Sequence, residues 1–85
     1  MRVDRDFDAL RKTLGGNVRR LRLARKLSQE DLAFDADIDR TYVSQIERAV
    51  INPSLLVLYK IGKVLGADVV QLLTAPRIQI RRPDR

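Results

Sequence analysis

Apolar side chains recur every three or four positions along most of the chain, which is the spacing of one face of an α-helix. The first of these stripes predicts a helix from about Asp6 to Lys26. It keeps its phase across the glycine pair at positions 15 and 16, so the helix is expected to be continuous. The side chains of this stripe are Phe7, Leu10, Leu14, Val18, Leu21 and Arg25.

Four shorter helices are predicted from capping residues and from the same periodicity. Ser28 and Asp39 stand where N-cap residues are expected for helices over 29–36 and 40–48. A fourth helix follows the Asn52-Pro53-Ser54 turn and ends at Gly66, and a short fifth begins at Asp68. The fourth helix has the predicted core stripe Leu55, Leu58, Ile61, Gly62 and Leu65, and the fifth runs through Leu73 before Pro76.

These elements predict an all-α fold, a compact bundle of five helices in one small domain. Residues 1–13 form an N-terminal extension of the first helix, and residues 14–75 form the domain itself. Residues 76–85 are a basic C-terminal tail, in which Ile78 and Ile80 alternate with polar residues. That alternation leaves two interpretations open, a frayed tail or a short strand.

The amino-acid composition already excludes several classes of function. The 85 residues contain no cysteine and no histidine, which removes the commonest metal ligands, nucleophiles and general bases. No catalytic site, metal or cofactor is therefore expected. The chain has no run of 18 apolar residues that could span a membrane, and its N-terminus lacks the features of a secretory signal. With 17 basic and 11 acidic residues the net charge is +6, which favours a polyanionic partner.

The segment from Gln29 to Arg48 has the residue spacing of a helix-turn-helix. A small residue, Ala33, stands at its fifth position, where the second helix crosses the first. The ninth position, in the turn, requires positive φ and is occupied by Asp37, which tolerates that region better than most residues. Ile38, Val43 and Ile46 stand at the positions that hold the two helices together. An ordinary helical hairpin remains the alternative.

The sequence resembles the Cro and phage-repressor-like helix-turn-helix regulators over about residues 14–73. The matching segments are 21–33 (LRLARKLSQEDLA), 39–48 (DRTYVSQIER) and 52–67 (NPSLLVLYKIGKVLGA). Residues 39–48 look most like the controller proteins of restriction–modification systems. The resemblance implies a lambda-repressor-like DNA-binding domain. The family usually has glycine where Ala49 stands and often where Lys26 stands, so the turns at these two positions depart from its pattern.

Helix geometry then assigns candidate DNA contacts. If Val43 and Ile46 face the core, the opposite face of the predicted helix presents polar side chains to a DNA groove. Candidate base contacts are Arg40, Thr41, Ser44 and Gln45, and candidate backbone contacts are Gln29, Tyr42, Arg48 and Asn52. A solvated surface position remains the alternative for each of them.

Two structural roles complete the predicted site. Glu47 lies on the buried side of its helix, and the resemblance implies that Arg22 pairs with it in a structural salt bridge. Hydrophobic side chains in excess of those needed for the core predict a homodimer, as does the resemblance. The candidate interface residues are Leu56, Tyr59, Val70 and Leu73.

The sequence as a whole predicts a homodimeric transcriptional regulator that binds a pseudo-palindromic site in double-stranded DNA in the cytoplasm. A restriction–modification controller is the more specific form of this prediction. The alternative is an antitoxin that binds its toxin and regulates its own synthesis, against which the short ends of the chain argue. No enzyme activity, no membrane association and no small-molecule effector domain are expected.

Overall fold

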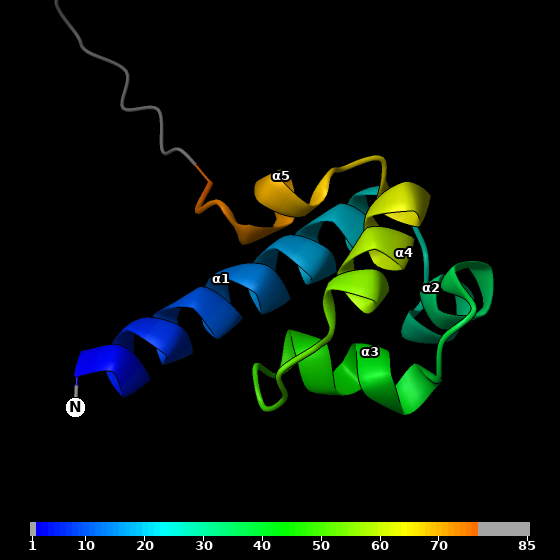
Figure 1. The fold of residues 1–85 in the computed structure, drawn as a ribbon. Coiled ribbons are helices and arrows are strands. Elements are labelled where there is room, and N and C mark those ends of the chain that lie inside the picture. The colour runs from blue at the N-terminus through cyan, green and yellow to red at the C-terminus, as the bar shows by residue number, and fades with distance from the viewer. Residues whose placement is uncertain (1, 77–85) are drawn as a thin grey trace, which may run out of the picture.

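The computed structural model describes residues 2–76, and its side chains from Asp4 onward. These residues form five α-helices and no strand, which confirms the predicted all-α fold (Figure 1). The predicted alternation at Ile78 and Ile80 lies outside the described residues. The helices are α1 (Arg2–Ala24), α2 (Gln29–Ala36), α3 (Arg40–Glu47), α4 (Leu55–Leu65) and α5 (Val69–Leu73).

The predicted bounds of two helices need correction. The first helix begins at Arg2 rather than Asp6, and Asp4 in its first turn interacts favourably with the positive end of the helix dipole. It ends at Ala24 because Lys26 adopts the left-handed conformation, with φ of 58°. The third helix ends at Glu47, and Arg48 is its C-cap rather than its last residue.

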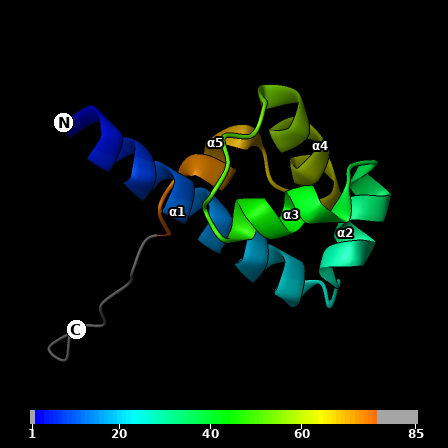
Figure 2. The same cartoon turned by 90° about the horizontal axis from the view of Figure 1, so that it is seen from below.

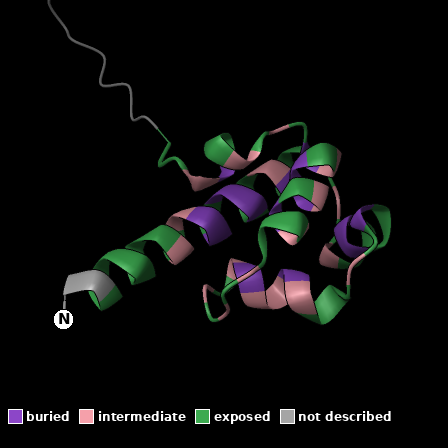
Figure 3. Cartoon of the chain, viewed as in Figure 1, coloured by how far each residue is buried: buried purple, intermediate pink, exposed green. Residues whose placement is uncertain are grey.

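Every helix contributes to the single hydrophobic core. The second half of α1 lies at its centre, in contact with α3, α4 and α5, whereas the first half projects beyond the other helices (Figures 1 and 3). One predicted core residue is wrong, because Leu55 is 70% exposed. The buried apolar residues are Leu14, Val18, Leu32, Ala33, Ala36, Val43, Ile46, Leu58, Ile61, Leu65 and Leu72.

Three helix ends in the described chain place a residue other than glycine in the left-handed region. Lys26, Asp37 and Ala49 have φ of 58°, 57° and 61° and follow α1, α2 and α3 respectively. At Asp37 this confirms the conformation that the turn of a helix-turn-helix requires. Lys26 and Ala49 adopt the same conformation, which favours glycine, at a cost of about 1 kcal/mol each. The turns therefore keep their geometry without the residue best suited to it.

Two polar side chains, one in α1 and one directly after it, satisfy the C-terminal carbonyls of other helices. Asn17, only 1% exposed, donates from Nδ2 to the carbonyl oxygens of Leu72 and Thr74, both at 2.9 Å. Arg25 donates from Nε to the carbonyl oxygen of Leu65 at 3.0 Å. The last carbonyls of a helix have no partner within it, so these bonds attach the end of α5 to α1 and the end of α4 to the residue that follows α1.

The backbone of α3 passes very close to α1 at Gly15. A Cβ atom at this position would lie 2.6 Å from the carbonyl oxygen of Ile46 and 2.8 Å from that of Glu47. At the neighbouring Gly16 a Cβ atom would meet nothing within 4 Å. Only the first of the two glycines is therefore required by packing.

We expect opposite effects when the two glycines are replaced by alanine. Gly15→Ala should destabilise the domain by about 1–3 kcal/mol, because the added methyl group forces α1 away from α3. Gly16→Ala should stabilise it by about 0.5–1 kcal/mol, because alanine loses less backbone entropy in a helix. Urea unfolding followed by circular dichroism measures both. Equal effects of the two substitutions would contradict the close approach at Gly15.

Candidate nucleic-acid interface

Helices α2 and α3 and the three residues between them form the predicted helix-turn-helix (Figure 2). Ala33 is buried where the two helices cross, and its carbonyl oxygen accepts a hydrogen bond from the backbone N–H of Ile38 at 2.9 Å. Val43 and Ile46 face the core and are completely buried or nearly so. The residues predicted to hold this motif together therefore occupy the expected positions.

The face of α3 opposite Val43 and Ile46 points to solvent. Arg40, Thr41 and Arg48 are exposed, and Ser44 and Gln45 are half-buried. The first turn is fixed by the N-cap Asp39, whose carboxylate accepts from the backbone N–H of Thr41 at 2.9 Å. The four residues predicted to contact bases thus lie on α3, whose first turn is capped by Asp39, and Arg48 follows them as the C-cap.

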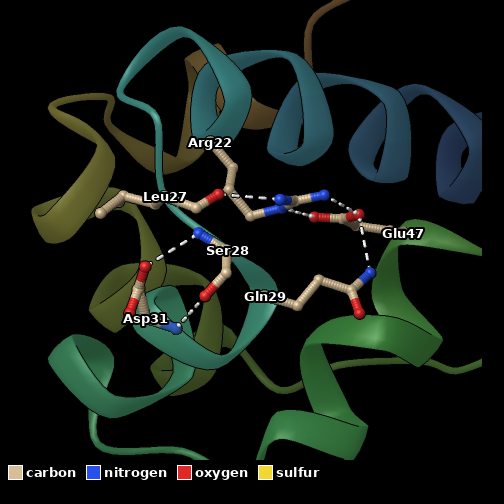
Figure 4. A network of polar contacts seen from close by, with 6 residues as sticks. All are labelled: Arg22, Leu27, Ser28, Gln29, Asp31 and Glu47. Atoms are coloured by element: carbon tan, nitrogen blue, oxygen red, sulfur yellow. Dashed lines mark hydrogen bonds and ion pairs between the residues drawn. The ribbon is translucent and has the colours of Figure 1, made fainter.

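A buried ion pair connects α1 to the end of α3 (Figure 4). Nε of Arg22 lies 2.6 Å from Oε2 of Glu47, and a second guanidinium nitrogen donates to Oε1 at 3.0 Å. The third guanidinium nitrogen donates to the carbonyl oxygen of Leu27 at 2.8 Å. The hydrogen bond to Glu47, opposed by burial, raises the pKa of Arg22 above its ordinary value. Arg22 and Glu47 thus form the predicted salt bridge in a bidentate geometry, which is the strongest for such a pair.

Gln29 joins this network instead of standing free at the start of α2. Its side-chain nitrogen donates to Oε1 of Glu47 at 3.0 Å (Figure 4), so one of its two amide protons is already used. Glu30 and Asp31 also lie in the first turn of α2, where their charges compete with a bound anion. No local pattern predicts the bond between Gln29 and Glu47, which are 18 positions apart. Gln29 therefore positions α2 relative to α3, whatever else it contacts.

A capping box holds the start of α2. The backbone N–H of Ser28 donates to Asp31 at 3.1 Å, and the hydroxyl of Ser28 accepts from the backbone N–H of Asp31 at 2.9 Å. Hydrogen bonding of the carboxylate, first to the backbone N–H and then to the side chain of Ser28, lowers the pKa of Asp31 below its ordinary value. The contribution of the Asp31 carboxylate to stability is therefore complete above that ordinary value and is lost as the pH falls through the lowered one.

Tyr42 and Asn52 lie where the chain passes from α3 to α4. The phenol oxygen of the half-buried Tyr42 accepts a hydrogen bond from the backbone N–H of Ser54 at 3.3 Å. The proton of the same hydroxyl is left for another acceptor, such as a phosphate oxygen. Asn52 is exposed in the connecting segment. The two predicted backbone-contact residues therefore belong to neighbouring parts of one surface.

The residues predicted for a dimer interface divide into two groups. Leu56, Tyr59 and Val70 are exposed on α4 and α5, which pack against each other, and the mispredicted Leu55 is exposed beside them in the sequence. Leu73 is half-buried and packs against the core. The first group is available to another molecule, whereas much of Leu73 is already in use.

Comparison with known proteins identifies the family. A family model described as helix-turn-helix matches residues 18–72, which is more than half of the chain. The chain belongs to the helix-turn-helix family of transcriptional regulators. This regulator is 46% identical over 65 residues to the control protein C.BamHI of Bacillus amyloliquefaciens, an alignment that covers 75% of this chain and 80% of the relative.

Two solved structures are similar to the regulator in both sequence and fold. The restriction-modification controller protein C.AhdI from Aeromonas hydrophila matches with a TM-score of 0.71 and 39% identity, over 75% of this chain and 97% of that one. The hypothetical transcription factor NHTF from Neisseria matches with a TM-score of 0.76 and 42% identity, over 79% and 77%. These relatives are regulators and controllers, which confirms that the chain is not an enzyme. None of the helices within residues 2–76 is long and apolar enough to cross a membrane.

We expect Glu47→Ala to be the most damaging single change in this network. Removing the carboxylate leaves the charge of Arg22 buried without a partner, which should destabilise the regulator by about 3–5 kcal/mol. Gln29→Ala removes one hydrogen bond to the same carboxylate and should cost only about 1 kcal/mol. Urea unfolding monitored by circular dichroism distinguishes the two.

A double substitution provides the control for this prediction. Arg22→Met with Glu47→Leu removes both charges, so its stability should recover most of the loss that Glu47→Ala causes. If Glu47→Ala costs no more than Gln29→Ala, the ion pair is not the main connection between α1 and α3.

Proposed function

We propose that the regulator binds a pseudo-palindromic operator as a homodimer, with α3 of each protomer in a major groove. The observation that carries the proposal is the polar, solvent-facing side of α3 opposite the buried Val43 and Ile46. In a helix-turn-helix the second helix enters the major groove with its N-terminal residues toward the base edges. The net charge of +6 favours attraction to the phosphate backbone.

The base-reading residues in this proposal are Arg40, Thr41, Ser44 and Gln45. An arginine can donate two hydrogen bonds to guanine, and a glutamine can pair in the same way with adenine. Thr41 offers a methyl group to thymine, and Ser44 can donate to or accept from either base of a pair. Arg40 is exposed in the first turn of α3 and can form the two-bond contact with guanine, so it should contribute most to sequence discrimination.

Phosphate contacts in this proposal come from residues on both sides of α3. Arg48 follows α3, Asn52 lies in the next connection, and Tyr42 has a hydroxyl proton to donate. Gln29 would use its second amide proton or its backbone N–H, because its first amide proton is bound to Glu47. These contacts fix the register of the protein on the duplex without reading its sequence.

The dimer is proposed from the apolar surface of α4 and α5. Leu55, Leu56, Tyr59 and Val70 are large apolar residues that stay exposed on these two helices. A contiguous exposed apolar patch is typical of an interaction site, and a two-fold interface uses the same patch on both protomers. Leu73 would lie at the edge of this interface, with only its exposed part in contact.

We further propose that the regulator controls the expression of a restriction–modification system from the cytoplasm. Its similarity to the control protein C.BamHI and to the controller protein C.AhdI supports this role over that of an antitoxin. Regulation would follow the concentration of the dimer rather than a small effector molecule. An endonuclease or methyltransferase gene adjacent to the regulator's own gene would support the controller role, and the absence of both would contradict it.

Replacing Arg40 by alanine tests the base-reading proposal. Arg40→Ala should weaken binding to the cognate operator by about 1–3 kcal/mol per half-site and weaken binding to random DNA much less. The operator is first obtained by selecting bound sequences from a random pool. Fluorescence anisotropy with labelled duplexes then measures both affinities over a range of salt concentrations.

Arg48→Ala is the matched control, since it removes an exposed arginine at the C-cap of the same helix. It should weaken binding to both DNAs by similar amounts and reduce the salt slope by about one per half-site, as a lost phosphate contact does. If Arg40→Ala shows the behaviour expected of Arg48→Ala, Arg40 is a backbone contact and does not read bases.

A charge placed on the apolar surface of α5 tests the dimer. Val70 is 72% exposed, so Val70→Glu should leave the fold intact and produce a monomer with reduced operator affinity. One helix reads only a few base pairs, so affinity depends on joining two half-sites. Sedimentation measures the mass, and circular dichroism measures the helix content.

Phe34→Glu serves as the control, because it puts the same charge on an exposed apolar residue of α2, outside the proposed interface. This variant should remain dimeric. Leu73→Glu is a poorer probe, since Leu73 also packs against the core. A folded Val70→Glu protein that is still dimeric would place the interface on another surface.

A further inference from the structure

The first half of α1 carries an apolar face that no helix within residues 2–76 covers. Phe7 and Leu10 are 37% and 41% exposed, although they continue the stripe that is buried from Leu14 onward. This half of α1 projects beyond the rest of the domain (Figure 3). At its base lies a groove of about 130 Å³ between α1, the α3–α4 connection, α4 and α5. Its walls include Phe7, Leu10, Leu14, Pro53, Leu58 and Leu73.

Arg11 provides a second, independent feature of this groove. Its guanidinium group lies over the ring of Phe7, 5.0 Å from the ring centroid, and it forms an ion pair with Asp8. Its Nε atom is buried and has no hydrogen-bond partner within the described residues. Buried donors in folded proteins almost always have an acceptor. The groove wall therefore suits an occupant that is apolar and also brings a hydrogen-bond acceptor.

We propose that the occupant is the C-terminal segment of the same chain, residues 77–85. Leu73 lines the groove, and only three further residues are described after it. Asn17 of α1 holds the carbonyl oxygen of Thr74 at 2.9 Å, so the described chain ends beside α1 (Figures 1 and 2). The segment thus starts next to the groove that it would fill.

The spacing of the two isoleucines in this segment fits the groove. In an extended chain Ile78 and Ile80 project to the same side, about 7 Å apart, and lie within about 7 and 13 Å of Pro76. The stretch of α1 from Phe7 to Leu14 is about 10 Å long, so both isoleucines reach it. The backbone carbonyls of an extended segment would also supply the acceptor that Nε of Arg11 lacks.

The natural chain has no cysteine, so a pair of introduced cysteines gives an unambiguous proximity test. Leu10→Cys with Ile80→Cys should form a disulfide under mild oxidation, and the product should have the mass of one chain. The control is Lys12→Cys with Ile80→Cys, because Lys12 is exposed on the opposite face of α1. The first pair should react at least about tenfold faster, since docking raises the effective concentration of the two thiols.

Two outcomes of the cysteine experiment would overturn the proposal. Equal oxidation rates for the two pairs would mean that the segment does not dock on this face. A disulfide between two chains, seen as a doubled mass on a denaturing gel without reductant, would assign the groove to the segment of a second copy. Circular dichroism of each reduced variant checks that the fold is retained.

Thermal unfolding of the full chain gives a second measurement without cysteines. Ile80→Asp should lower the melting temperature, because it places a charge in the apolar groove. Gln79→Asp changes the neighbouring residue, which faces away from the groove in an extended segment, and should leave the melting temperature nearly unchanged. Identical melting temperatures for these two variants and the natural chain would overturn the proposal.

Discussion

The buried pair of Arg22 and Glu47 is the interaction on which the rest of the arrangement depends. Two charges withdrawn from water are tolerated only when each is fully satisfied, and here the satisfying groups come from α1, α2, α3 and the turn after α1. The observed packing of α1, α2 and α3 therefore leaves neither of these two charges without a partner. Glu47 is the last residue of α3, so its ion pair with Arg22 fixes the orientation of this helix. The pair thereby orients the proposed DNA-binding face of α3, although it does not lie on that face.

Helix α1 transmits this arrangement to the other end of the domain. Gly15 brings it against the C-terminal end of α3, and Asn17 attaches it to the end of α5. Arg25, the residue directly after α1, donates to the end of α4. The proposed DNA surface and the proposed dimer surface are thus held to one rigid element. In a two-fold dimer the separation of the recognition helices must match the helical repeat of DNA, so such rigidity has a direct function.

The helix ends show how a fold tolerates residues that do not suit it locally. Lys26, Asp37 and Ala49 all adopt left-handed backbone geometry, and each does so beside well-packed core residues. The local strain is small compared with the apolar burial that depends on these turns. Departures from glycine at Lys26 and Ala49 therefore change the stability of the turns and leave their geometry intact.

The sequence alone determined the helices, the helix-turn-helix and the exposed face of α3, because these depend on periodicity, caps and one turn, all of which are local. Tertiary structure decided the rest. Leu55 has the spacing of a core residue, yet whether it is buried depends on neighbours that periodicity does not describe. Asn17 occupies a position in an apolar stripe, and its partners Leu72 and Thr74 lie more than 50 residues away. The sequence predicts Gln29 as a contact to the DNA backbone, but its bond to Glu47 exists only once α2 packs against α3. Polar partners distant in sequence are selected by packing, and no local pattern records them.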